Sequence, residues 1–119
     1  MAIASDDEVI GVVSIHLRED IARRSAEIGY WLGEPFWGQG ITTKAVCAIT
    51  SWAFDTFDLV RIDATVLEWN AASARVLEKN GFVYEGKSQM SLIKDGKTID
   101  GLVYALIDDS RGNIPRKNI

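Results

Sequence analysis

The sequence has little of what several protein classes require. Its 119 residues include one cysteine, Cys47, and one histidine, His16. A single cysteine rules out an internal disulfide, and a structural zinc site needs a cluster of such ligands. No apolar run approaches the roughly 20 residues of a membrane span, and the first residues lack the pattern of a signal peptide. We therefore expect a cytoplasmic domain with no metal and no membrane partner.

Basic residues are also scarce. Lys and Arg number 13 against 17 Asp and Glu, and three of the basic residues, Arg111, Arg116 and Lys117, follow Asp109 in the C-terminal tail. An acidic domain is a poor match for nucleic acid, which binds clustered basic side chains. The negative charge mildly favours a cationic partner such as an amine, although acidic surfaces often serve only solubility.

The rest of the composition is typical of one globular domain. Hydrophobic residues make up 47% and charged residues 25% of a chain that is long enough for one core but not for two. We expect a single domain over residues 1–109, followed by a polar C-terminal tail at 110–119.

The hydrophobic pattern predicts a mixed α/β order. Short apolar or alternating runs indicate strands at 1–5, 9–17, 26–32, 61–67, 82–93 and 98–107, and three- and four-residue spacing indicates helices at 41–57 and 71–80. Asn70 should cap the second helix, Gly81 should end it, and Asp95-Gly96 should turn the last hairpin. Because both helices lie in crossover connections, we expect a three-layer α/β/α sandwich with a mixed, mostly antiparallel sheet.

One stretch has the features of a phosphate site. The apolar strand that ends at Leu32 is followed by a glycine-punctuated turn from Gly33 to Gly40, and the first helix begins directly afterwards. Such an arrangement points free backbone N–H groups and a helix N-terminus at an anion. Nucleotide hydrolysis is disfavoured, because Gln39-Gly40 stands where a Walker A loop needs Lys-Ser/Thr. A dinucleotide fingerprint is disfavoured because Thr43 replaces its third glycine.

The same residues resemble a known family. The stretches Glu27-Ile-Gly-Tyr-Trp-Leu32 and Trp37-Gly-Gln-Gly-Ile-Thr-Thr-Lys-Ala45 resemble the acetyl-CoA motif of the GNAT N-acetyltransferases. The later residues Asn70-Ala-Ala-Ser73 and Leu77-Glu-Lys-Asn-Gly-Phe82 are similar to the second half of that family, and closest to the branch that acetylates ribosomal-protein N-termini. The resemblance covers residues 2–108 and implies the acyl-CoA N-acyltransferase fold.

This resemblance implies acetyl-CoA as the co-substrate and a primary amine as the acceptor. The acceptor is left open between a protein N-terminus, a polyamine, an amino acid and an antibiotic. The pyrophosphate is expected on the backbone of residues 38–43, the pantetheine arm beside the strand ending at Leu32, and an oxyanion donor at the amide of Trp31 or Leu32. The expected cofactor-binding residues are Tyr30, Trp31, Leu32, Trp37, Gly38, Gln39, Gly40, Ile41, Thr42, Thr43, Asn70 and Ser73.

Two residues are candidates for proton transfer. Glu27 matches the position of the catalytic Glu in a related branch, and partial burial there would favour its role as the base. The alternative is a surface Glu paired with Arg23 or Arg24. Ser73 is the candidate acid for the leaving thiolate, since Leu77 stands where many relatives carry a Tyr; the alternative is a helix Ser that bonds only backbone. Glu85 is a lesser candidate for the base.

Other residues have simpler expected roles. Gly29 predicts a bulge or a close approach to the backbone. Cys47 and Trp52 are expected in the core. Trp31, Trp37 and Trp69 are candidates for the substrate cleft, and His16 is more often a packed or solvated side chain than a catalytic one.

The start of the chain differs from the family pattern. We expect the strand and two helices that the family places before the first hairpin to be missing, which predicts either a homodimer that covers the exposed face or a fragment. The competing functional reading is a non-catalytic acyl-CoA-binding or interaction module, which would bind CoA without turnover.

Overall fold

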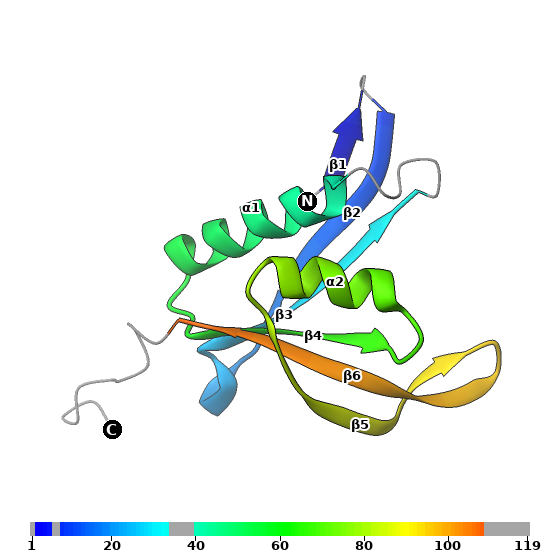
Figure 1. The fold of residues 1–119 in the computed structure, drawn as a ribbon. Coiled ribbons are helices and arrows are strands. Elements are labelled where there is room, and N and C mark those ends of the chain that lie inside the picture. Colours follow the sequence, from blue (N-terminus) through cyan, green and yellow to red (C-terminus); the bar gives the residue numbers. More distant parts are fainter. Residues whose placement is uncertain (1, 6–7, 34–39, 109–119) are drawn as a thin grey trace.

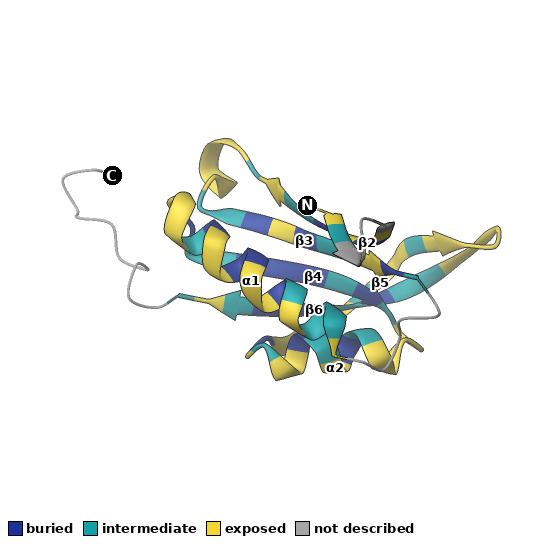
Figure 2. Ribbon diagram, turned by 90° about the horizontal axis from the view of Figure 1, so that it is seen from above, coloured by how far each residue is buried: buried dark blue, intermediate teal, exposed yellow. Residues whose placement is uncertain are grey.

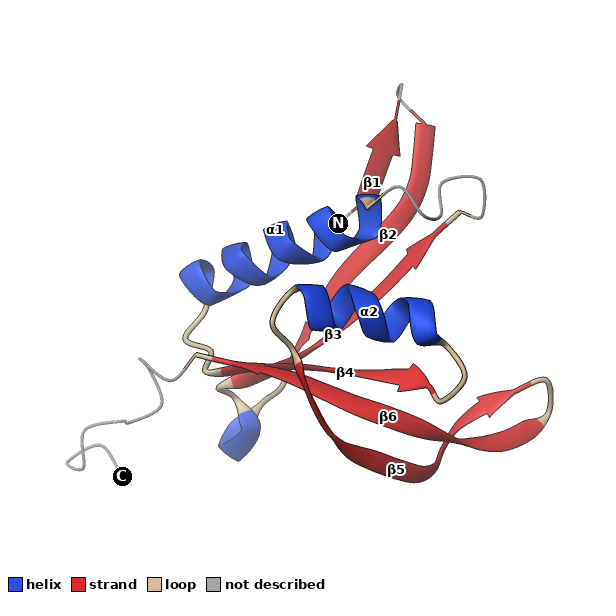
Figure 3. Ribbon diagram, in the orientation of Figure 1, coloured by secondary structure: helices blue, strands red, loops and turns tan. Residues whose placement is uncertain are grey.

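A computed structural model describes residues 2–5, 8–33 and 40–108. The strands are β1 (Ala2–Ser5), β2 (Glu8–Leu17), β3 (Ser25–Leu32), β4 (Arg61–Leu67), β5 (Val83–Lys94) and β6 (Lys97–Ile107). The helices are α1 (Ile41–Thr56) and α2 (Ala71–Lys79), with a short 3-10 turn η1 (Asp20–Ala22) between β2 and β3. Figures 1 and 3 show this order, which agrees with the order predicted from the sequence.

The strands form one mixed sheet in the order β1-β2-β3-β4-β6-β5. Neighbours pair antiparallel except β3 and β4, which are parallel. The β3–α1–β4 and β4–α2–β5 connections step across the sheet in the same direction. Right-handed crossovers that step the same way place their helices on the same face. Both helices accordingly lie side by side above one face of the sheet (Figures 1 and 3).

The predicted fold class, an α/β domain with a mixed and mostly antiparallel sheet, is confirmed. Of the three expected layers, the described residues form the sheet and the helical layer on one face (Figure 2). Neither described helix has the length and apolar character to span a bilayer.

The predicted turn and cap residues act as expected. Asn70 Oδ1 accepts the backbone N–H of Ser73 at 3.0 Å, which caps α2. Gly81 follows α2 at φ 84°, a left-handed conformation that glycine adopts without strain. Asp95 and Gly96, at φ 52° and 77°, turn the β5–β6 hairpin.

The core lies between the sheet and the two helices. Alternate residues of β4, namely Ile62, Ala64 and Val66, point toward the helices, where they meet Ile49 of α1 and Leu77 of α2. Cys47 and Trp52 are not part of this core. Cys47 is exposed, and Trp52 is 47% exposed with its ring edge against Phe57. The prediction that both are core residues was wrong because the buried stripe of α1 runs through Val46, Ile49, Thr50 and Ala53.

The position of Ile62 makes the core testable. Ile62 is fully buried, whereas Ile93 on β5 is 80% exposed. Ile62→Ala is expected to lower the free energy of unfolding by about 2–5 kcal/mol, because it removes packed methyl groups and leaves a cavity. The matched control Ile93→Ala should cost less than about 1 kcal/mol. Urea titration of both variants measures the difference, and equal losses would contradict this description of the core.

Candidate active site

A gap opens between β3 and β4. The two strands pair only at Ser25–Arg61, Ala26–Ile62 and Glu27–Asp63. Beyond that point β3 continues beside β2 as far as Leu32, and β4 continues beside β6 as far as Leu67. A cavity of about 230 Å³ lies between the separated strands, and Tyr30, Asn70 and Ser73 are among the residues that line it.

The backbone of β3 faces this gap with alternate amides. Gly33 N–H donates to the carbonyl oxygen of Ile10 and Arg18 N–H donates to the carbonyl oxygen of Ser25, so odd-numbered residues of β3 bond β2. The N–H groups of even-numbered residues, including Ile28 and Tyr30, therefore point toward β4. Of the two amides predicted as oxyanion donors, that of Leu32 lies on the gap side and that of Trp31 points toward β2. The pairing of β2 and β3 is regular through Gly29, so the predicted bulge is not present there.

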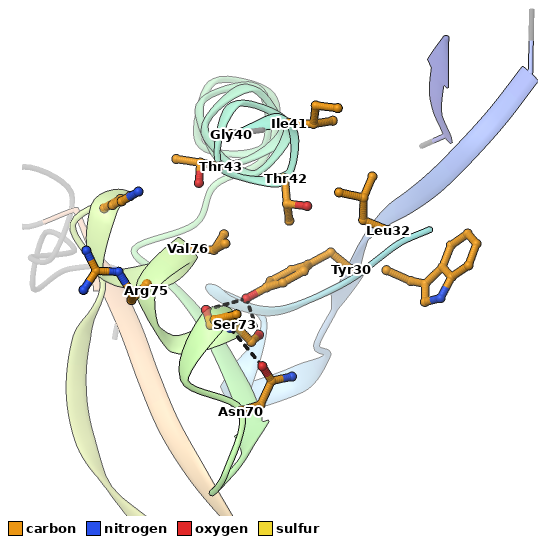
Figure 4. A pocket seen from close by; sticks show the side chains of 13 residues that line it. Tyr30, Leu32, Gly40, Ile41, Thr42, Thr43, Asn70, Ser73, Arg75 and Val76 are labelled. Atoms are coloured by element: carbon orange, nitrogen blue, oxygen red, sulfur yellow. Dashed lines mark hydrogen bonds between the residues drawn. The ribbon is translucent and has the colours of Figure 1, made fainter. Parts of the chain in front are cut away.

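A second, larger cavity adjoins the gap on the helical face (Figure 4). This groove of about 480 Å³ lies between β3, the first turn of α1 and one side of α2. The structure brings together nine of the residues predicted to bind the cofactor, namely Tyr30, Trp31, Leu32, Gly40, Ile41, Thr42, Thr43, Asn70 and Ser73. The predicted Trp37, Gly38 and Gln39 lie outside the described residues.

The N-terminus of α1 opens into the groove. Gly40 precedes the helix at φ 73° without a side-chain cap, and the first turn contains no acidic residue. Among the residues that the structure describes, no atom lies within 4 Å of the place that a side chain at Gly40 would take, which leaves room for a ligand beside this backbone. The uncapped N–H groups and the helix dipole favour an anion here, such as a phosphate.

Two cations on α2 also line the groove, and the sequence interpretation missed them as ligand-binding residues. Arg75 and Lys79 are exposed and form no ion pair within the described part of the chain. They share one side of α2 with Ala72 and Val76, as residues three or four positions apart do. The four-residue spacing of these two cations, on the side of the helix that carries Ala72 and Val76, is the signal that could have identified them.

Ser73 contacts a side chain from another element. Tyr30 Oη lies 2.7 Å from Ser73 Oγ and 3.0 Å from the Ser73 carbonyl oxygen (Figure 4). Burial raises the pKa of the Tyr30 phenol above its usual value, and the hydrogen bond with Ser73 opposes this shift. Leu77, one turn further along α2, is fully buried and supplies no hydroxyl.

Glu27 lies on the opposite face of the sheet, at the closed end of the gap. Alternation along the strands places it in one row with His16 of β2 and Asp63 of β4, its partners in register. Glu27 is exposed, so the partial burial that would favour its role as the base is not present. Its carboxylate forms no hydrogen bond or ion pair within the described residues. Arg23 and Arg24, its alternative partners, bond the Asp20 carbonyl oxygen and Asp58 instead.

An ion-pair network fixes the strands beside Glu27. Asp63 is buried and accepts two hydrogen bonds from Arg18, at 2.7 and 2.8 Å, and one from Arg61 at 3.1 Å. Arg61 also holds both oxygens of Glu85 at 2.7 Å. The bond from Arg61 lowers the pKa of Glu85, and the bond to Asp63 raises the pKa of Arg18. Glu85 is thus already engaged, which disfavours it as the base.

Comparison with known proteins identifies the class that this geometry belongs to. A family model described as the acetyltransferase (GNAT) domain matches residues 1–83, which is more than half of the chain. The chain therefore belongs to the GNAT acetyltransferase family.

Individual relatives agree with this assignment. The chain is 40% identical over 105 residues to the probable N-acetyltransferase YjcK of Bacillus subtilis, spanning 88% of this chain and 58% of the relative. It is 35% identical over 109 residues to the ribosomal-protein-serine acetyltransferase of Escherichia coli, spanning 92% of this chain and 60% of the relative. The structure of Mycobacterium smegmatis RimJ in complex with CoA-disulfide superposes with a TM-score of 0.84 at 34% identity, over 92% of this chain and 52% of that one. The chain thus spans little more than half the length of these relatives.

The Asp63 network should contribute measurably to stability. Asp63→Asn is expected to lower the free energy of unfolding by about 1–3 kcal/mol, because two arginines would lose a buried anionic acceptor. Glu85→Gln removes an exposed partner of the same Arg61 and should cost no more than about 1 kcal/mol. Urea unfolding at neutral pH compares the two, and an Asp63→Asn variant as stable as the wild type would contradict the role assigned to the network.

The Glu85–Arg61 pair should respond to acid. Because Arg61 lowers the pKa of Glu85 below its ordinary value of 4.5 in the folded state, the pair stabilises the fold above that value. Its contribution should fade as the pH falls through the lower folded pKa. The difference in urea midpoint between the wild type and Glu85→Gln should therefore shrink with acidification, over the range in which the protein stays folded. A difference that is independent of pH would refute this.

Proposed function

We propose that the protein is an acetyl-CoA-dependent N-acetyltransferase that transfers the acetyl group to a primary amine by direct attack in a ternary complex. The observation that carries the proposal is the position of the β3–β4 gap. Tyr30 and Ser73 border the gap on the helical face, and Glu27 lies at its closed end on the other face. A thioester held in the gap can thus meet an amine from one side and a proton donor from the other.

The groove fits the CoA moiety of this substrate. Its pyrophosphate would take the backbone N–H groups at the start of α1, with Arg75 and Lys79 close by on α2. The pantetheine arm carries amides, so it can pair like an added strand with the edge of β3 that diverges from β4. The gap-facing amides of β3 then supply a donor to the thioester carbonyl oxygen, where negative charge develops during attack.

Proton transfer follows from the same geometry. An amine is mostly protonated at neutral pH and attacks only as the free base. The Glu27 carboxylate lies in the field of Arg18 but forms no hydrogen bond or ion pair with a described residue, so it can take the proton from the amine, directly or through water. Ser73 is on the side of the departing sulfur and can donate a proton to the thiolate. One proton leaves nitrogen and one reaches sulfur, which balances the reaction.

The proposed acceptor class is a protein N-terminal amine. It rests on relatives whose names state that they acetylate ribosomal proteins, such as the ribosomal-protein-serine acetyltransferase of Escherichia coli. Thiol release from acetyl-CoA, measured with N-terminal peptides, polyamines and amino acids, tests it. Turnover with peptides alone supports this acceptor, and turnover only with a polyamine or amino acid replaces it. CoA binding without turnover on any amine would favour the non-catalytic module.

Glu27 should affect turnover and not cofactor binding. Glu27→Gln is expected to lower kcat by about 100-fold, because the base is lost, while the Kd for CoA measured by calorimetry stays within about threefold. Glu78→Gln is a matched control, since Glu78 is an exposed residue of α2 that does not line the groove. If Glu27→Gln weakens CoA binding as much as turnover, its role is structural and the assignment of the base fails.

Arg75 and Lys79 should affect cofactor binding and not the chemical step. Arg75→Gln and Lys79→Gln are each expected to raise the Kd for CoA by roughly three- to tenfold, most clearly at low salt, because each removes a cation near the phosphates. The kcat at saturating acetyl-CoA should change little. Lys97→Gln, at the tip of the β5–β6 hairpin, is the charge-matched control. Unchanged affinity in both α2 variants would remove these residues from the site.

A further inference from the structure

Tyr30 and Ser73 form a pair of hydroxyls that joins β3 to α2. The residues are 43 positions apart in the sequence, and their side-chain oxygens lie 2.7 Å apart. Tyr30 and Ser73, with Asn70, line both the groove and the β3–β4 gap, so the pair lies where the two cavities meet. Figure 4 shows the Tyr30 hydroxyl directed at the first turn of α2.

The hydroxyl of Tyr30 has one proton and two acceptors within reach. The Ser73 carbonyl oxygen at 3.0 Å can only accept, whereas Ser73 Oγ can donate or accept. When Tyr30 donates to the carbonyl oxygen, the Ser73 hydroxyl must donate to Tyr30 Oη. When Tyr30 donates to Ser73 Oγ, the Ser73 proton becomes free to point into the cavity. Rotation of two hydroxyl groups thus converts a closed arrangement into one that offers a proton.

We propose that Tyr30 supplies the leaving thiolate with its proton through Ser73. The inference rests on the N-acetyltransferase function proposed above. It identifies the residue that replaces the proton given up by the candidate acid, Ser73. As the carbon–sulfur bond breaks, the Ser73 hydroxyl proton passes to the sulfur and the Tyr30 proton passes to Ser73 Oγ. The phenolate regains a proton from solvent, while the proton lost by the amine leaves through Glu27.

The chemistry explains why a serine needs this partner. A serine hydroxyl that gave up its proton alone would become a strongly basic alkoxide. With Tyr30 behind it, the negative charge comes to rest on a phenolate, and a phenol is a far stronger acid than an aliphatic hydroxyl even when burial raises its pKa. Burial keeps Tyr30 protonated at neutral pH, so it enters the reaction as a donor. Because Tyr30 acts through Ser73, it is a positioning residue in this scheme.

A double-mutant cycle tests the inference. Tyr30→Phe keeps the ring and removes the hydroxyl, Ser73→Ala removes the second hydroxyl, and Tyr30→Phe/Ser73→Ala removes both. Tyr30→Phe should lower kcat by about 10- to 100-fold, with the Kd for CoA within about threefold of the wild type. The double variant should be no slower than Ser73→Ala, because residues that act in series are not additive. Tyr84→Phe, on an exposed residue of β5, is the control and should leave kcat unchanged.

The outcomes separate this inference from the proposed function. If the fold-losses in kcat of Tyr30→Phe and Ser73→Ala multiply in the double variant, the two residues act independently. This result would overturn the relay but leave the proposed acetyltransferase function intact. If Tyr30→Phe lowers kcat and CoA affinity by equal factors, the hydroxyl of Tyr30 contributes to CoA binding and not to proton transfer. This result would also overturn the relay. A wild type that binds CoA but acetylates no amine would overturn both the proposed function and the relay. Circular dichroism of each variant confirms folding.

Discussion

The separation of β3 from β4 is the constraint on which the rest of the site depends. The two strands share a ladder of three residue pairs, and each is held along its other edge by a longer antiparallel ladder, β3 by β2 and β4 by β6. Each strand therefore stays extended after the two diverge. The divergence leaves backbone groups of β3, the amide of Tyr30 among them, without a neighbouring strand inside a folded domain. Such groups need a partner, and a substrate arm with its own amides can supply one.

Charge and packing fix where the gap begins. The last pair of the parallel ladder joins Glu27 to Asp63, and Arg18 and Arg61 hold Asp63 from both sides. Both arginines of this network bond Asp63, whereas Glu27 interacts with Arg18 only at longer range and accepts no hydrogen bond from a described residue. On the helical face, α2 lies over the open part of the gap and brings Ser73 to Tyr30. The same gap is therefore bordered by the Glu27 carboxylate on one face and by a pair of hydroxyls on the other.

The sequence predicts the local features of this structure well. The order of strands and helices, the Asn70 cap, the turn at Gly81 and the Asp95-Gly96 hairpin follow from short-range rules of conformation and hydrogen bonding. The side of the groove formed by β3 and α1 also follows, since strand, glycine turn and helix are contiguous in the chain. Each of these features depends on residues only a few positions apart.

Features that depend on tertiary contacts are predicted less well. The sequence pattern does not show whether Gly29 lies in a bulge or at the edge of a gap, because both place glycine in a strand. It placed Cys47 and Trp52 in the core because a helix offers several nearly equivalent apolar stripes, and packing against the sheet selects one. It missed Arg75 and Lys79 as groove residues, and it did not reveal that Tyr30 meets Ser73, since 43 residues separate them.

The central claim is that CoA lies along the groove with its pantetheine arm in the β3–β4 gap. Titration of the isotope-labelled protein with CoA, followed by amide chemical shifts, tests it most directly. The account predicts saturable shifts at residues 28–32 of β3, at 64–67 of β4 and in the first turn of α1, with little change at the tip of the β5–β6 hairpin. Shifts confined to the hairpin, or none at the gap with CoA in millimolar excess, would contradict it.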